Sequence, residues 1–312
     1  MPELPEVTTT VNGLQKVLPK MTISDVWTDL AKKDQKIKQF KETIKDEKFF
    51  INFKKKVIGQ KIIKVRRRAK NILIDISQGY TILIHLKMTG HLLFGGYTQD
   101  KKTQKWYPEK EGALTDPFNR FIHVVFSLKN KNSQRKFLVF CDARKFGKIT
   151  ILKTEEANLS KELKNIGPEP LENPFTFSLF KNRLALKPKG KIKTVLMDQN
   201  IIAGIGNIYS DEMLWLSGIN PKSICSKIPD GKLKLLYKSM HQILSKSITL
   251  GGDSMSDYRN IKGERGNFQN YHKVYRKSGQ KCLKNKCCGI IKREVISGRS
   301  AHFCPEHQKL FK

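Results

Sequence analysis

The second residue of the chain, Pro2, could act as a nucleophile through its own backbone nitrogen. Removal of Met1, which a small second residue favours, would leave Pro2 with a free secondary amine. An α-amino group has a pKa of about 7.7–8.0, so a useful fraction of it is unprotonated at neutral pH. Such an amine can attack the C1′ atom of a sugar, expel the base and form an iminium, which acidifies the C2′ proton and permits β-elimination.

Two carboxylates, Glu3 and Glu6, flank this nitrogen. They could protonate the sugar oxygen or move protons around a covalent intermediate. A purely structural interpretation also exists, in which a proline-rich segment begins the first helix and Glu6 interacts with the helix dipole. The N-terminal residues alone favour this structural interpretation, so a catalytic one needs support from the rest of the chain.

A second group with chemical potential lies near the other end of the chain. Four of the six cysteines, Cys282, Cys287, Cys288 and Cys304, fall within the last 31 residues. Structural zinc takes four tetrahedral ligands, usually as two close pairs. Cys304 and His307 form the second pair, and the first pair is Cys282 with either Cys287 or Cys288. Both pairs together leave no open coordination position, so we expect one structural zinc ion per chain.

The charge of the chain points to a polyanionic partner. Lys and Arg number 60 against 28 Asp and Glu, which gives a formal net charge of +32. The excess positive charges repel one another in a compact fold, and nucleic acid offers a dense row of phosphates that would neutralise them. A lysine-rich proteome is the alternative explanation. No apolar run approaches the ~20 residues that a membrane span needs, and the start is acidic, unlike a signal peptide. We therefore expect a soluble, intracellular protein.

The hydrophobic pattern changes twice along the chain. Residues 7–18 have helical spacing, and residues 61–152 contain short β-rich runs separated by Gly, Asn and Lys turns, as in an antiparallel sandwich or barrel. The polar stretch 95–119 is aperiodic and is interpreted as an inserted loop. Beyond a Gly-Pro-Glu-Pro linker at 167–170, helical patterns return up to residue 250, and a short cysteine-rich segment with two strand-like runs ends the chain.

Several separate segments, in order along the whole chain, resemble the formamidopyrimidine-DNA glycosylase (Fpg/Nei, MutM) family. One such motif would be weak, whereas the set in register is specific. The segments are 1–7 (MPELPEV), 67–70 (RRAK), 85–90 (HLKMTG), 142–147 (DARKFG), 167–171 (GPEPL), 196–199 (LMDQ), 204–209 (GIGNIY), 251–252 (GG) with 257–258 (DY), and the cysteine finger that carries 298–299 (GR).

The resemblance implies an α+β fold with an N-terminal β-sandwich or barrel domain, a helical domain with a helix–two-turn–helix, and a C-terminal zinc-finger-like β-hairpin. The polar loop 253–268 would occupy the lesion-recognition region. The expected boundaries are 1–165 for the catalytic domain, 166–181 for the linker, 182–270 for the helical DNA-binding domain with this loop, and 271–312 for the zinc finger.

The same resemblance implies roles for individual catalytic residues. Pro2 would be the Schiff-base nucleophile, Glu3 the acid that assists sugar opening, and Glu6 a carboxylate near the reacting base. Lys70 would contact the phosphate beside the lesion and aid elimination. Without the motif, Lys70 would be interpreted as one more exposed lysine at the end of a strand.

Other positions match DNA-contacting residues of the family. Met88 and Phe146 would wedge into the base stack and Arg144 would bond the orphaned partner base, since extruding a nucleotide costs a few kcal/mol of stacking. The alternative is that Met88 and Phe146 are core residues. Asn207, in a glycine turn before a helix, would bind phosphate, and Arg299 would do so from the fingertip.

For the finger, the resemblance favours Cys288, because Cys288-Gly289 matches the family's knuckle turn. The predicted ligands are therefore Cys282, Cys288, Cys304 and His307, with Cys287 as a spare thiol that a loosened loop could use instead. His307 departs from the four cysteines that are typical of the family. A finger that keeps its hairpin without zinc, as in some members, is the alternative.

The expected function is that of a bifunctional DNA glycosylase and AP lyase of base excision repair. It would excise oxidised purines, such as 8-oxoguanine and formamidopyrimidines, from damaged double-stranded DNA, with β,δ-elimination after Schiff-base formation. No redox or nucleotide cofactor is needed, and we expect a monomer, in the cytoplasm or nucleoid if the host is bacterial. The alternatives are a Nei-like enzyme for oxidised pyrimidines and a noncatalytic DNA-binding relative.

Overall fold

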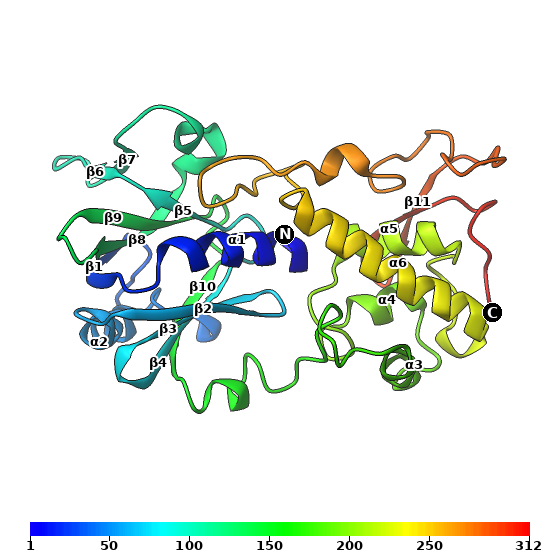
Figure 1. The fold of residues 1–312 in the computed structure, drawn as a ribbon, viewed down its shortest axis with the longest axis horizontal. Helices are drawn as coiled ribbons and strands as arrows, with labels where there is room; N and C mark the ends of the chain where they lie inside the picture. Colours follow the sequence, from blue (N-terminus) through cyan, green and yellow to red (C-terminus); the bar gives the residue numbers. More distant parts are fainter. The chain divides into compact units, whose positions relative to one another are not determined.

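The computed structural model describes all 312 residues and divides the chain into two compact units. Unit 1 comprises Met1–Lys164 and Gly251–Asn267, and unit 2 comprises Asn165–Leu250 and Phe268–Lys312. Figure 1 shows the two large sheets of unit 1 and the long helices of unit 2. None of the helices combines the length and apolar character that a membrane span requires.

Unit 1 is built on two four-stranded antiparallel sheets. Their strand orders are β1-β8-β9-β5 and β10-β4-β3-β2. Side chains that alternate along the strands of both sheets, together with the buried face of the first helix, make one apolar core, as expected of a sandwich. The strands are β1 (Thr22–Thr28), β2 (Ile62–Arg68), β3 (Asn71–Ile76), β4 (Tyr80–His85), β5 (His91–Gly95), β8 (Ile122–Lys129), β9 (Arg135–Cys141) and β10 (Lys148–Lys153).

Helix α1 (Leu4–Val17) begins three residues before the predicted helix. Leu4, Val7 and Leu14 are fully buried on the face that packs on the core, so the helical spacing identified this face correctly. Pro5 lies in the first turn, where its missing N–H leaves no hydrogen bond unmade. The second helix, α2 (Glu47–Val57), has Asp46 as its N-cap, with the Asp46 carboxylate accepting from Phe49 N.

The inserted segment 95–119 is more ordered than the expected loop. It contains the short hairpin of β6 (Tyr97–Gln99) and β7 (Trp106–Pro108), followed by two 3-10 turns. Tyr97 and Trp106 pack with residues of β5, β8 and β9 that face away from the main core. The insertion therefore covers the outer face of the first sheet and buries apolar side chains there.

Unit 2 is helical with a terminal hairpin. Its elements are α3 (Phe177–Ala185), α4 (Ile192–Met197), α5 (Asn207–Ser217), α6 (Asp230–Thr249), β11 (Lys292–Ile296) and β12 (Arg299–Phe303). The four helices share one apolar core, and the two strands pair antiparallel. The predicted fold class, an α+β protein with N-terminal sheets, a helical region and a terminal hairpin, is confirmed.

Loop 251–267 groups with unit 1, although the sequence analysis placed it with the helical segment. Phe94 N, at the end of β5, donates a 2.7 Å hydrogen bond to Ile261 O. The Ile261 side chain is buried in the core of unit 1, and Gly13 of α1 leaves room for it, because a Cβ there would lie 2.9 Å from Ile261 Cγ1. The loop is thus part of the sandwich by packing.

Candidate functional site

The N-terminal end of α1 holds two buried carboxylates directly after Pro2. Pro2 is buried, and Glu3 and Glu6 are each 2% exposed. Glu3 N donates to Glu6 Oε2 at 2.7 Å, and the Glu3 side chain accepts from the backbone of Glu6, which completes a capping box. The pair therefore has a fixed geometry at the start of the helix, directly after Pro2 in the chain.

Glu6 is also bound by a segment that is remote in sequence. Its Oε1 accepts from Asp253 N at 2.8 Å, and its backbone oxygen accepts from the Tyr258 hydroxyl at 3.0 Å. Gly252 lies so close that a Cβ there would be 3.0 Å from Glu6 Cγ, and its φ of +84° favours glycine. Loop 251–267 thus binds the carboxylate oxygen of Glu6 that Glu3 N does not bind. Apart from the motif around them, no sequence pattern indicated Asp253 or Tyr258.

Lys70 lies in the turn between β2 and β3 of the same unit and is only 6% exposed. Without the family motif, Lys70 would be expected to be one more exposed lysine at the end of a strand. The observed burial differs from that expectation. The turn is fixed locally, with Ala69 at a φ of +50° and Arg67 Nη1 donating to Ala69 O at 3.0 Å. Burial lowers the pKa of the His85 imidazole to about 3, and the positive charges of Lys87 and then Lys70 add to this effect.

Two turns from different strands bring Met88, Arg144 and Phe146 into one region of unit 1. Asp142 joins the turns, because its carboxylate accepts from the Thr89 hydroxyl, from Arg144 N at 3.3 Å and from Gly147 N at 2.6 Å. The Arg144 guanidinium lies 4.7 Å from the centre of the Phe146 ring.

These side chains are available to a ligand rather than part of the core. Phe146 is 46% exposed, Arg144 is exposed and Met88 is half-buried. Gly147 is required beneath Phe146, since a Cβ at that position would lie 2.2 Å from Phe140 Cζ in the core. An aromatic ring, a thioether and a guanidinium held on a tied pair of turns suit stacking and hydrogen bonding with nucleobases.

In unit 2, Asn207 is the first residue of α5. The preceding turn is shaped by Gln199, whose Oε1 accepts from Gly204 N and whose Nε2 donates to Ile205 O, both at 2.8 Å. No side chain caps this helix at Gly206, and a helix N-terminus of this kind favours an anion. Arg299 lies at the tip of the β11–β12 hairpin and is exposed.

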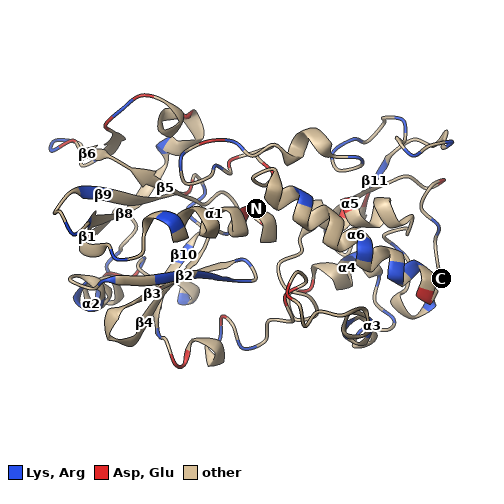
Figure 2. Cartoon of the chain, in the orientation of Figure 1, with Lys and Arg blue, Asp and Glu red and all other residues tan.

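Basic residues are spread over both units (Figure 2). Strand β2 is basic along much of its length, with the sequence IIKVRRR. Within this strand, Arg66 is paired with Asp75 at 2.9 Å. The formal charge of +32 is therefore not confined to one element, which is typical of a protein that follows a phosphate backbone.

Three thiols converge at the base of the hairpin in unit 2. The sulfur atoms of Cys282, Cys287 and Cys304 all lie within 4.8 Å of one another, with 3.7 Å between the last two. Trp215 Nε1 donates to Cys282 Sγ at 3.4 Å and Gly289 N to Cys287 Sγ at 3.4 Å. Converging thiols that receive N–H donors fit a soft or borderline cation such as zinc.

This cluster corrects the predicted choice of Cys288. The Cys288 side chain is exposed, and Cys287 occupies the position in the cluster. The following glycine explains the difference, because a Cβ at Gly289 would lie 2.5 Å from Cys304 Sγ. Gly289 therefore packs against the cluster, and its neighbour Cys288 lies outside it.

The predicted fourth ligand, His307, does not belong to the three-thiol cluster in this structure. Its Nε2 lies 2.7 Å from Trp215 O, and because a carbonyl only accepts, this nitrogen carries the proton. Its backbone N–H is directed at Cys304 Sγ at 3.5 Å. The Nδ1 atom therefore keeps the lone pair that a metal would need.

Buried carboxylates of α5 connect the helix to the cysteine-rich segment, and the sequence analysis did not identify them. Asp211 Oδ1 pairs with Lys193 Nζ at 2.5 Å, both being at most 1% exposed, and its Oδ2 accepts from His302 N at 2.9 Å. Glu212 Oε1 accepts from three successive backbone N–H groups, among them Tyr275 N at 2.8 Å. These contacts fix the hairpin that carries Arg299.

Family models match both parts of the chain. The model described as the formamidopyrimidine-DNA glycosylase N-terminal domain matches residues 1–149, and that of the formamidopyrimidine-DNA glycosylase H2TH domain matches residues 166–259. The formamidopyrimidine-DNA glycosylase of Pelotomaculum thermopropionicum is 35% identical over 312 residues, which cover 99% of this chain and 100% of that protein. The same enzyme of Carboxydothermus hydrogenoformans is 36% identical over 313 residues, with the same coverage.

Solved structures agree with the sequence matches. Lactococcus lactis Fpg in complex with DNA containing an abasic site has a TM-score of 0.79 and 29% identity, over 98% of this chain and 99% of that chain. The wild-type enzyme with DNA containing N7-benzyl-Fapy-dG has a TM-score of 0.79 and 30% identity, over 99% and 100%. Family models, relatives and structures all cover the segments that hold Pro2, the Arg144 turn and the Asn207 turn. This chain is therefore a member of the formamidopyrimidine-DNA glycosylase family of DNA repair enzymes.

Proposed function

We propose that the protein is a bifunctional DNA glycosylase and AP lyase that excises oxidised purines from duplex DNA. The observation that carries this proposal is the pair of buried glutamates directly after Pro2, in which the backbone N–H of Glu3 donates to the carboxylate of Glu6 at 2.7 Å. A family that acts on damaged DNA supplies the context. Removal of Met1 is required, because in the intact chain the Pro2 nitrogen is an amide.

The reaction follows from the chemistry of a secondary amine. The Pro2 nitrogen forms a bond to C1′ of the damaged nucleotide, and the glycosidic bond breaks with its electron pair leaving on the base. Glu3 protonates the ring oxygen as the sugar opens, which gives an iminium. Loss of a C2′ proton expels the 3′ phosphate, a second elimination expels the 5′ phosphate, and water releases the enzyme. Glu6, fixed by Glu3 and Asp253, orients the reacting base.

The remaining site residues hold DNA. Met88, Arg144 and Phe146 fill the space left by the extruded nucleotide, since lost stacking must be offset by new contacts. Lys70 binds the phosphate beside the lesion, and its burial supports a defined position rather than a solvated one. Asn207 at the start of α5 and Arg299 at the hairpin tip bind the backbone, and the enzyme acts as a monomer.

Zinc in this protein would be structural. Cys282, Cys287 and Cys304 would hold it, and His307 is the candidate for the fourth ligand through Nδ1, the nitrogen that its bond to Trp215 O leaves unprotonated. Bound zinc would stabilise the hairpin that presents Arg299. No step of the reaction passes through the metal.

The test is covalent trapping. The protein without Met1 is incubated with an 8-oxoguanine duplex and borohydride, and the reduced adduct is mapped by peptide mass spectrometry. An adduct on the Pro2 nitrogen is expected, and a matched preparation that retains Met1 is expected to give none there. Absence of an adduct with any oxidised base would refute the enzymatic proposal. Faster trapping with an oxidised pyrimidine than with 8-oxoguanine would assign the other substrate class.

A further inference from the structure

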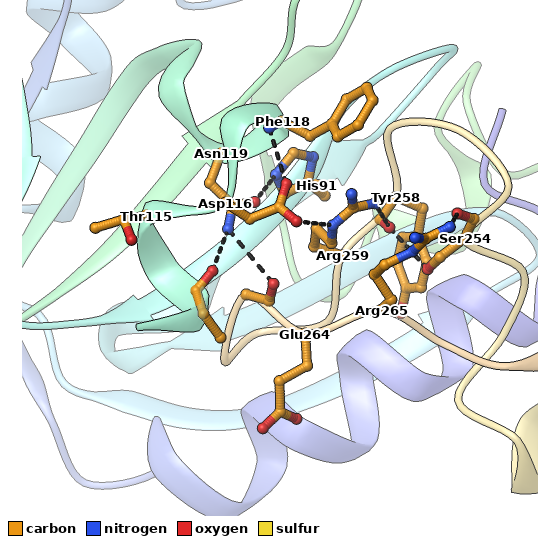
Figure 3. Close-up of polar contacts among 12 residues, drawn as sticks. His91, Thr115, Asp116, Phe118, Asn119, Ser254, Tyr258, Arg259, Glu264 and Arg265 are labelled. Carbon is orange, nitrogen blue, oxygen red and sulfur yellow. Dashed lines mark hydrogen bonds and ion pairs between the residues drawn. The ribbon is translucent and has the colours of Figure 1, made fainter. Parts of the chain in front are cut away.

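The insertion 95–119 packs against loop 251–267 through a buried arginine (Figure 3). Arg259 is 2% exposed, and its Nε lies 3.1 Å from Asp116 Oδ2. The guanidinium is also 4.6 Å from the centre of the Phe118 ring. Both Asp116 and Phe118 belong to the insertion, so a side chain of the loop is held between a carboxylate and an aromatic face of the inserted segment.

A second contact joins the same two segments. Asn119 Nδ2 donates to Ala113 O at 2.8 Å and lies 3.5 Å from Gly263 O, while its Oδ1 accepts from His91 Nε2 at 2.9 Å. A Cβ at Gly263 would lie 2.4 Å from Ala113 O. The two backbones therefore touch, and the insertion is fitted to the loop at two separate points.

Hydrogen bonds, together with the backbone of residues 253–254, connect this arginine to Glu6, the candidate catalytic residue. Arg259 Nη1 donates to Tyr258 O at 2.9 Å, and the Ser254 hydroxyl donates to the same oxygen at 2.8 Å. Ser254 follows Asp253, whose N–H donates to Glu6 Oε1 at 2.8 Å. The Tyr258 hydroxyl donates to the backbone of Glu6 at 3.0 Å. The conformation of residues 253–259 thus determines both contacts on Glu6.

We propose that Asp116, Phe118 and Arg259 are positioning residues, which fix the carboxylate of Glu6 for base release by holding loop 251–267 in one conformation. This inference rests on the proposed function, in which Glu6 orients the reacting base. It assigns a purpose to the insertion, for which no direct contact with Pro2, Glu3 or Glu6 has been described.

The chemistry of the pair favours positioning over simple stability. Arg259 is buried, whereas the Asp116 side chain is 23% exposed. Such an ion pair is a weak source of folding free energy, because desolvation of the charges opposes their attraction. Its geometry is nevertheless specific: a guanidinium that binds Ser256 O, Tyr258 O and the carboxylate of Asp116 has one orientation. Such a residue specifies the conformation of a polar loop, which the loop's backbone contacts alone would not specify.

The experiment compares Asp116→Asn and Phe118→Leu with Asp100→Asn. Asp100 is a matched control, because it lies in the same insertion and its carboxylate accepts hydrogen bonds from the local residues Lys102 and Thr103. Each variant, without Met1, is assayed in single turnover for base release from an 8-oxoguanine duplex and for borohydride trapping on a duplex with a preformed abasic site. The second substrate has no base for Glu6 to orient.

For Asp116→Asn, base release at saturating duplex is expected to slow by about tenfold, with half-saturation and abasic-site trapping changed by less than about threefold. Phe118→Leu is expected to act in the same direction, and Asp100→Asn to match the parent protein. Base release by Asp116→Asn within about twofold of the parent would overturn the inference. An equal loss on both substrates with a lower melting temperature would also overturn it, because that result indicates a merely structural role.

Hydrogen exchange separates this inference from the proposed function. In Asp116→Asn the amides of residues 253–259 are expected to exchange about tenfold faster, with residues 71–76 of the core strand β3 unchanged. If the parent protein traps no DNA at all, the proposed function fails, and this measurement still decides whether the insertion positions the loop on Glu6. Unchanged exchange at 253–259 would overturn the inference.

Discussion

His91 gives the sharpest test of the packing between the insertion and the sandwich. The imidazole is 1% exposed, and its Nε2 lies 2.9 Å from Asn119 Oδ1. An amide oxygen only accepts, so Nε2 carries the proton of a neutral ring. Burial lowers the pKa of His91 from 6.5 to about 4, an effect that the nearby positive charge of Arg259 increases and the hydrogen bond to Asn119 partly opposes.

The magnitude follows from proton linkage. Between pH 6.5 and about 4 the unfolded chain binds a proton at His91 that the folded chain does not bind. Stability therefore rises with pH across this window and is lost as the pH falls through it. A pKa difference of about 2.5 at about 1.36 kcal/mol per unit gives a loss of about 3 kcal/mol in the free energy of unfolding.

The substitution His91→Gln isolates this effect. Glutamine can still donate from Nε2 to Asn119 but does not titrate. Urea unfolding of both proteins at pH 7.5 and 4.5 is expected to show a relative gain for His91→Gln of about 2.5 kcal/mol on going to the lower pH. The repulsion among other charges, and the titration of His85, whose pKa is also lowered, to about 3, act equally on both proteins. Parallel pH dependences of the two proteins would refute the reasoning.

Three further predictions concern other buried groups and the thiol cluster. Asp211→Asn leaves the Lys193 ammonium, 1% exposed, without its counter-charge and is expected to lower the free energy of unfolding in urea by about 3 kcal/mol. Lys45→Met is expected to raise it by about 1–2 kcal/mol at pH 7, because burial lowers the pKa of Lys45 to about 8 and the protonated folded form is disfavoured. That gain should vanish in melts near pH 10. Cys287→Ser is expected to lose bound zinc, measured as metal content after purification without added zinc, whereas Cys288→Ser should keep it; the reverse pattern would contradict the observed cluster.

Local sequence patterns predicted the helices and strands well, because these are determined by interactions between residues that are close together in the chain. The apolar spacing of residues 7–18 identifies the buried face of α1, and the capping box of Glu3 and Glu6 explains why that helix begins at Leu4. The same holds for α6, which ends at Thr249, one residue before the predicted end of the helical patterns at residue 250. The strand runs between residues 61 and 152 supply seven of the eight strands in the two sheets of unit 1, whereas β1 (Thr22–Thr28) was not predicted.

Such patterns could not predict contacts between segments that are distant in the sequence. Arg259 and Asp116 have no periodic relation, and a basic residue in a polar loop is normally solvated, so nothing in the sequence marks Arg259 as buried. The choice between Cys287 and Cys288 depended on which way one turn faces, which the close packing of Gly289 decides in the structure. Adjacent cysteines leave that choice open until the backbone is known.

The structural and catalytic interpretations of the N-terminal residues are not exclusive. A helix N-terminus stabilises carboxylates through its unbonded N–H groups and its dipole, so Glu3 and Glu6 have a structural reason to be ordered there. In the proposed reaction, the same bonds would fix two acid–base groups close to Pro2 in the chain at no further conformational cost. Because Glu6 divides its oxygens between Glu3 N and Asp253 N, its position depends equally on the helix start and on loop 251–267. The insertion, by holding that loop, becomes part of the same geometry, although it lies far from Pro2 in the sequence.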